Sequence, residues 1–146
     1  MTFSIVGRCR DTGQLGIAIS SSSIAVGARC PWVRSRVGAV ATQNITLPSL
    51  GPQVLELLQS QQLEPAAALH RALGKDKWSQ YRQVTVIDEQ GRTAFFTGQE
   101  SLGTHGAMAG EQCIAAGNML ASIEVIQAMV RSFEKASGSL ADRLMF

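Results

Sequence analysis

Residues 1–21, MTFSIVGRCRDTGQLGIAISS, contain the pattern on which the predicted fold depends. In residues 2–9, alternate side chains fall on opposite faces, and this period of two predicts a β-strand. One face carries Phe3, Ile5 and Cys9, and the other carries Thr2, Ser4, Val6 and Arg8. Residues 10–14, RDTGQ, place Asp and Gly where a chain reverses tightly, and the nearly all-apolar residues 15–21 predict a return strand. The stretch therefore predicts a β-hairpin.

Thr2 stands at the very start of the first predicted strand, directly after the initiator Met. Aminopeptidases remove an initiator Met when the next residue is small, and removal of Met1 would leave a hydroxyl and a free α-amine on one residue. Such a pair is a nucleophile with its own base. A free α-amine has a pKa of roughly 8, close to the pH at which a general base is most useful. The alternative is that Thr2 is simply a strand residue.

The rest of the chain alternates between further strand and helix patterns. Strands are predicted at residues 37–43, 81–88, 92–97 and 111–116, and helices from Pro48-Ser49, from Glu64-Pro65 to Gly74, at 121–135 and at 139–146. Pro31 is expected to interrupt regular structure, and the Gly-rich residues 98–110 to form a loop. Because hairpins rather than βαβ units open and close this order, we expect an α+β fold with antiparallel sheet.

Composition excludes several functional classes. The 146 residues suit one domain, and the net charge of +2 comes from scattered Lys and Arg, so we expect no nucleic-acid partner. Hydrophobic residues make up 45% and charged residues 16%, which predicts a homo-oligomer, a dimer or larger, with apolar surface buried between subunits.

Targeting and redox features point to the cytoplasm. The N-terminus resembles no signal peptide, and no apolar run approaches the roughly 18 residues of a membrane helix, so we expect no membrane partner. Three cysteines without paired spacing predict reduced thiols in a cytoplasmic protein. The two histidines lie far apart with no carboxylate cluster nearby, so no metal site is expected.

Four segments, in chain order, resemble the DUF1028 family. They are TFSIV at residues 2–6, GQLGIAISSSSIAVGARCPWVR at 13–34, VGAVATQN at 37–44 and AGNML at 116–120. The family is classed with the N-terminal-nucleophile (Ntn) hydrolases, so the resemblance implies a four-layer αββα sandwich of antiparallel sheets. Family members usually continue through a Gly-rich turn into a further strand. We therefore expect residues 1–146 to be a single Ntn-hydrolase-like domain that lacks this C-terminal segment.

The resemblance implies an amidohydrolase that acts on a small amide, with Thr2 as the nucleophile after removal of Met1 and with no cofactor. The alternative is a catalytically silent Ntn-fold protein with a binding or assembly role. Fold alone does not decide between them.

Further site residues follow from the strand ends. Asn44 and Asn118 each come after a strand, where a carboxamide either helps to form an oxyanion hole for catalysis or caps a turn. Predicted substrate-binding residues are Ser22, Ser23, Arg34 and His105. An arginine can hold a substrate carboxylate in a bidentate fork, and a histidine in the Gly-rich segment can make a polar contact. For each of these side chains, a structural role at the surface or at a strand end is the alternative.

Overall fold

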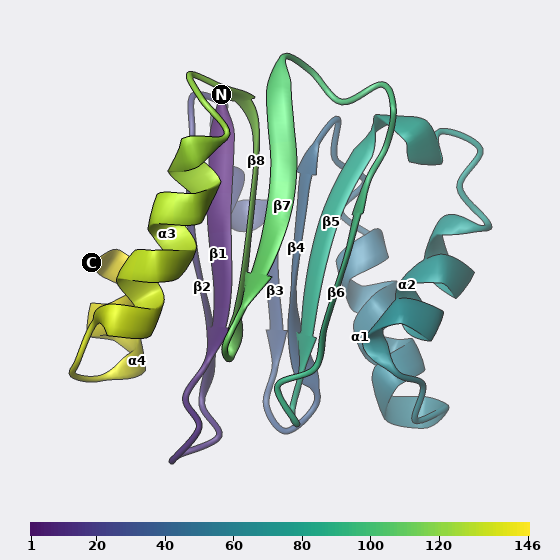
Figure 1. Ribbon diagram of the computed structural model, residues 1–146. Helices are drawn as coiled ribbons and strands as arrows, with labels where there is room; N and C mark the ends of the chain where they lie inside the picture. Colours follow the sequence, from purple (N-terminus) through teal and green to yellow (C-terminus); the bar gives the residue numbers. More distant parts are fainter.

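A computed structural model describes residues 1–146 and contains eight strands, four α-helices and two short 3₁₀ helices (Figure 1). The strands are β1 (Thr2–Arg8), β2 (Leu15–Ser21), β3 (Pro31–Arg34), β4 (Gly38–Asn44), β5 (Arg82–Asp88), β6 (Thr93–Thr97), β7 (Thr104–Gly110) and β8 (Cys113–Leu120). The helices are α1 (Leu50–Ser60), α2 (Pro65–Leu73), α3 (Glu124–Lys135), α4 (Leu140–Met145), η1 (Val26–Ala28) and η2 (Ser79–Tyr81).

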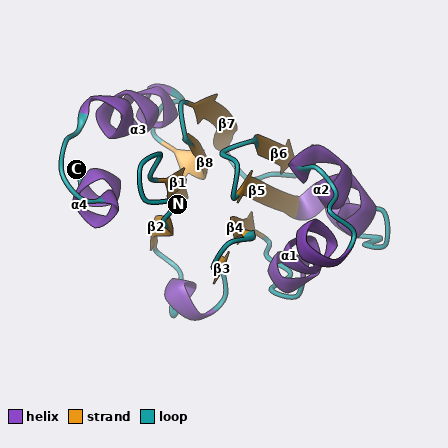
Figure 2. Cartoon of the chain, turned by 90° about the horizontal axis from the view of Figure 1, so that it is seen from below, coloured by secondary structure: helices purple, strands orange, loops and turns teal.

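The strands form two antiparallel sheets that face each other. The first sheet has the order β2-β1-β8-β7, and the second has the order β3-β4-β5-β6. Helices α3 and α4 lie beside the first sheet, and α1 and α2 lie beside the second (Figures 1 and 2). The mixed α+β class with antiparallel sheets is therefore confirmed, and so is the opening hairpin of β1 and β2.

The alternation along β1 places its two faces as predicted. Ile5 packs on the helix side of the first sheet, against Phe133 of α3. Val6 points between the sheets, where it joins a cluster that includes Ile87 and Ile114. Both edges of β1 are paired, with β2 and with β8, and these two clusters cover its two faces.

The second sheet is covered by the paired helices α1 and α2. Their buried side chains, among them Val54, Leu58 and Leu69, pack against Val40 and Val84 of the sheet in the largest apolar cluster. Pro65 occupies the first turn of α2, as its missing N–H allows, and Gly74 follows the last residue. The predicted helix at residues 121–135 begins later, at Glu124, and the one at 139–146 spans only Leu140–Met145.

The prediction of a loop across residues 98–110 is wrong, because residues 104–110 form strand β7 paired with β8. Its glycines serve close packing rather than turns. A Cβ added at Gly106 would lie 2.5 Å from Ile123 Cδ1, and one at Gly110 would lie 2.4 Å from Val130 Cγ1. The sequence Thr-His-Gly-Ala-Met-Ala-Gly is therefore poor in bulky residues because α3 lies directly on this strand.

Two other expectations need correction. Pro31 does not interrupt regular structure but begins β3, an edge strand, where a residue without an N–H costs no ladder hydrogen bond. The strand expected at residues 111–116 begins at Cys113 and continues to Leu120. It carries Asn118 inside the strand rather than after it.

We expect Gly110→Ala to destabilise the protein by about 1–3 kcal/mol, because the new Cβ meets Val130, Glu134 and Cys113 within 2.9 Å. Gly27→Ala is the matched control, since a Cβ there meets nothing within 4 Å, and its effect should stay within about 0.5 kcal/mol. Urea denaturation measures both. Equal stability of the two variants would contradict the close packing of α3 on β7.

Candidate active site

Three polar side chains form a row across neighbouring strands of the first sheet. Thr2 of β1 is the cross-strand partner of Ser21 in β2 and of Asn118 in β8. The Oγ1 atom of Thr2 lies 2.8 Å from the Oγ atom of Ser21. The alternation of β1 and β8 directs Thr2 and Asn118 toward the second sheet, like Val6 and Ile114. The row thus lies at the end of the interior between the two sheets.

A second polar row faces it from the other sheet. Gln43 of β4, Gln83 of β5 and Thr97 of β6 are cross-strand partners. Gln43 Oε1 accepts from Ser4 Oγ at 2.7 Å, Gln43 Nε2 donates to Gln83 Oε1 at 2.8 Å, and Asn118 Nδ2 donates to the same oxygen at 3.1 Å.

We call Ser4, Gln43, Gln83 and Asn118 the carboxamide network. All four residues are buried, with at most 3% of their surface exposed. The network joins the two sheets directly beneath Thr2. Gln43, Gln83 and Ser21 are not among the site residues predicted from the sequence. The available signal was one glutamine in each of the two predicted strands at residues 37–43 and 81–88.

While Met1 is present, the main-chain nitrogen of Thr2 is part of a peptide bond and is not a free amine. The amino group of Met1 donates to Ser22 Oγ at 3.1 Å and lies 3.7 Å from Met119 Sδ, while the Met1 carbonyl oxygen accepts from Ser22 N at 3.1 Å. Ser22 is thus adjacent to Thr2. Ser23 Oγ instead accepts from Arg29 Nη2 at 2.7 Å, in the exposed segment that follows β2.

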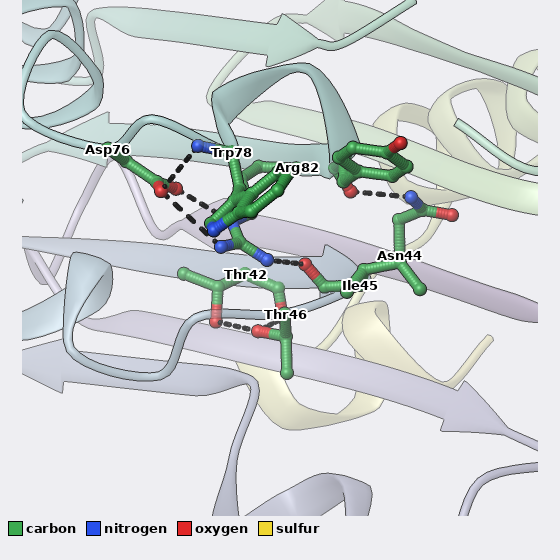
Figure 3. Close-up of polar contacts among 8 residues, drawn as sticks. Thr42, Asn44, Ile45, Thr46, Asp76, Trp78 and Arg82 are labelled. Atoms are coloured by element: carbon green, nitrogen blue, oxygen red, sulfur yellow. Dashed lines mark hydrogen bonds and ion pairs between the residues drawn. The ribbon is translucent and has the colours of Figure 1, made fainter. Parts of the chain in front are cut away.

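Asn44 lies at the same end of the sheets, but its carboxamide already binds main chain at both ends. Its Nδ2 donates to Tyr81 O at 2.5 Å (Figure 3). Its Oδ1 accepts from Leu102 N at 3.1 Å, and the backbone φ of Asn44 is 69°. Asparagine is one of the few residues that adopt this left-handed conformation readily. These contacts favour the turn role that the sequence left open beside the oxyanion role.

A buried ion pair supports the segment after Asn44. Arg82 Nε donates to Asp76 Oδ2 at 2.7 Å, and Arg82 Nη1 donates to Ile45 O at 2.7 Å (Figure 3). Both side chains of the pair are less than a tenth exposed. The hydrogen bond from Arg82, aided by one from the Trp78 main chain, lowers the pKa of Asp76 below its ordinary value.

The other two predicted binding residues differ in position. His105 lies in the irregular part of the β7–β8 ladder, between the positions that pair with Leu120 and Gly117, and its Nδ1 is 2.7 Å from Gly103 O. Arg34 pairs with Gly38 at the opposite end of β4 from Asn44, and it binds Glu56 and Gln59 of α1. The structure thus brings Thr2, Ser22 and Asn118 together, places His105 on the strand beside Asn118, and leaves Arg34 outside the group.

The cysteines offer no nucleophile in this row. Burial raises the pKa of Cys113 to about 12, and its side chain packs on the helix side of the first sheet. Burial also raises the pKa of Cys30. A hydrogen bond with the Thr12 side chain lowers the pKa of Cys9, but Cys9 follows the last residue of β1, at the far end from Thr2. No group of three or more His, Cys, Asp or Glu side chains is placed to hold a metal ion.

We expect Asp76→Asn to cost about 3–5 kcal/mol at neutral pH, because it leaves the buried Arg82 without its partner. Since the pKa of Asp76 is lowered by folding, its stabilisation is complete above the pKa in the unfolded chain and is lost as pH falls through the folded value. The difference between variant and wild type should therefore shrink in acid, as measured by urea denaturation over a pH series.

Glu56→Gln is the control for Asp76→Asn. It removes the charge from the partner of Arg34 in a pair whose Glu56 side chain is 61% exposed, and it should cost less than about 1 kcal/mol. If Asp76→Asn cost no more than this control, the buried pair would not support the segment after Asn44.

Comparison with known proteins identifies the family. The profile of the family of unknown function DUF1028 matches residues 2–146. Among solved structures, the chain is similar to protein SPO2555 from Silicibacter pomeroyi, itself described under DUF1028, with 30% identity and a TM-score of 0.95. The match covers 99% of this chain and 64% of that chain, so the chain spans less than two thirds of the length of this relative. No curated protein matches. The chain belongs to the DUF1028 family.

Proposed function

We propose that the protein is an Ntn-type amidohydrolase that acts on a small amide, with Thr2 as its nucleophile after removal of Met1. In this proposal the two sheets and their flanking helices are an Ntn-hydrolase-like four-layer αββα sandwich. The observation that carries it is the position of Thr2. Its hydroxyl lies on an inner strand, hydrogen-bonded to Ser21 and in one row with Asn118, at the end of the polar layer between the sheets.

The proposed reaction uses only groups of this chain and one water. The α-amine of Thr2 takes the proton from Oγ1 as Oγ1 attacks the amide carbon, and the tetrahedral species collapses as the amine leaving group receives that proton. Water, deprotonated by the same α-amine, then attacks the ester carbon on Thr2. The second tetrahedral species collapses as Thr2 Oγ1 leaves and takes that proton back from the amine, which releases the acid and restores the free hydroxyl and amine. Ser21 orients the Thr2 hydroxyl, and Ser22, Ser23 and His105 are proposed to contact the substrate.

A second candidate function, a silent binding or assembly protein, is favoured by an apolar cleft. The cleft encloses about 760 Å³ between β1, β2, α3 and α4 and is lined by Phe3, Ile17 and Met129. Met145 and Phe146 also line the cleft and are 80% and 86% exposed. We propose that this surface joins copies of the chain in a homo-oligomer, whichever of the two functions holds.

We also propose, from the weak net charge and the three free cysteines, that the protein is cytoplasmic and has no nucleic-acid or membrane partner. None of its helices has the length and hydropathy required to cross a bilayer.

We expect protein made without an N-terminal tag to lack Met1, as intact-mass spectrometry measures. A screen of amides with this protein should then yield a substrate. Thr2→Ala should abolish turnover of that substrate with the fold retained, because Thr2 is only half-buried, and Thr2→Ser should retain part of it because the hydroxyl and amine remain. Thr12→Ala, in the exposed turn at the far end of β1, is the control and should keep full activity.

Two results would count against this proposal. Retention of Met1 at full occupancy removes the base, since an acylated nitrogen cannot accept the proton. Full activity of Thr2→Ala would make Thr2 an ordinary strand residue.

We expect light scattering at micromolar concentration to give at least twice the chain mass of 15.6 kDa. Met145→Glu should shift the population toward monomer, because it puts a charge on an apolar surface that association would bury. A wild-type protein that is monomeric throughout would rule out association through this surface.

A further inference from the structure

The hydrogen bonds of the carboxamide network determine which end of the Gln83 side chain is the nitrogen and which is the oxygen. One end of the Gln83 carboxamide lies 3.2 Å from Gly106 O and 3.0 Å from Gly117 O. Carbonyl oxygens only accept hydrogen bonds, so this end is the Nε2 donor and the opposite end is the Oε1 acceptor. Main-chain atoms of the first sheet thus decide the orientation of Gln83.

The orientation of Gln83 decides that of Asn118. Since Gln83 presents Oε1, Asn118 meets it with Nδ2, at 3.1 Å. The Oδ1 atom of Asn118 therefore lies at the free end of the carboxamide, and it accepts no hydrogen bond although the residue is only 3% exposed. Only Thr85 Oγ1 and Ser101 Oγ are fully buried without a partner, so Asn118 Oδ1 is still reached from the surface and can accept from a donor at this edge of the interior.

Thr2 is the residue placed to supply that donor. It is the cross-strand partner of Asn118, and directly opposed residues on one face have Cβ atoms about 4.5–5.5 Å apart. While Met1 is present, the Thr2 nitrogen is a peptide nitrogen with one hydrogen. Removal of Met1 converts it to an ammonium group with three donors or an amine with two.

We infer that Gln83 is a positioning residue that holds Asn118 with its Oδ1 toward the α-amine of Thr2. The inference rests on the proposed function in that it requires Thr2 to be the first residue. An acceptor bound to one N–H of the amine limits its rotation and hence the direction of its lone pair. The same contact favours the charged ammonium form and so raises its pKa.

Few charged groups surround the Thr2 amine, so few other interactions would shift its pKa. Ser21 on β2, Gln43 on β4 and Gln83 on β5 are uncharged. His105 on β7 contacts Gly103 O, and Arg29 is bound to Ser23 Oγ and Ile24 O. Replacement of Asn118 by an apolar residue therefore changes a hydrogen bond without changing the charge around the amine.

The test uses the full chain with Thr2 as its first residue, released from a fusion by a protease that leaves no extra residue. NMR follows the Asn118 carboxamide carbon and the Thr2 resonances as pH is varied. In the wild type we expect the Asn118 carbon to shift with the same apparent pKa as the Thr2 amine. Asn118→Leu should lower the pKa of that amine by about one unit, the size expected for loss of a hydrogen bond to a charged group.

Gln83→Leu should lower the amine pKa in the same direction but by less, since Asn118 stays in place without its orienting partner. Asn44→Gly is the control, since glycine accepts the φ of 69° at this position, and it should leave the amine pKa unchanged because the Asn44 carboxamide binds main chain elsewhere.

An unchanged or raised amine pKa in Asn118→Leu would overturn the inference, since a donor facing the amine gives the opposite sign. The wild type alone can also overturn the inference. It would do so if the Asn118 carboxamide carbon showed no change in chemical shift as the Thr2 amine titrates. Because no substrate is involved, these results are separate from failure of the proposed function, which is read from Met1 retention and from the activity of Thr2→Ala.

Discussion

The hydrogen bond between the carboxamides of Gln43 and Gln83, with its extensions to Ser4 and Asn118, is the constraint on which the arrangement of the two sheets depends. Apolar side chains between sheets can slide past one another at little cost, but buried carboxamides must each find partners at fixed positions. Gln83 meets main-chain oxygens of Gly106 and Gly117 in the opposite sheet, so the sheets stack in one relative position. A slip of one residue in β5 would turn Gln83 outward and leave those oxygens unpaired.

The same constraint explains why the candidate site lies where it does. At one end of the interior, Val6, Ile87 and Ile114 form a dry contact between the sheets. At the other end, the two polar rows take the place of the apolar contact. Thr2 lies where these polar rows meet the protein surface. The Thr2 hydroxyl is hydrogen-bonded to Ser21 on the neighbouring strand, and the buried carboxamides of the network lie beneath it. The strands, and not the loops, determine its position.

Much of this arrangement follows from local sequence. The alternation in residues 2–9 predicts which β1 side chains face the interior, and turn residues predict the hairpin. The failures have physical causes. Strand β7 is rich in glycine because α3 packs on it, and glycine otherwise indicates turns. Gln43 and Gln83 resemble surface residues, because their partners come from a sheet formed by distant parts of the chain. Asn44 and Asn118 look equivalent in sequence, but one carboxamide binds main chain at both ends and the other joins the network.

The carboxamide network contains no ionisable group, whereas the segment after β4 depends on the Asp76–Arg82 pair. The carboxamide network and the Asp76–Arg82 ion pair therefore respond differently to acid. Protonation of Asp76 releases the guanidinium that binds Ile45 O and loosens the chain around Asn44, while the amides between the sheets keep every partner. We therefore expect amide hydrogen exchange in acid to begin at residues 44–46 and 76–81 before it reaches the strands joined by the carboxamide network.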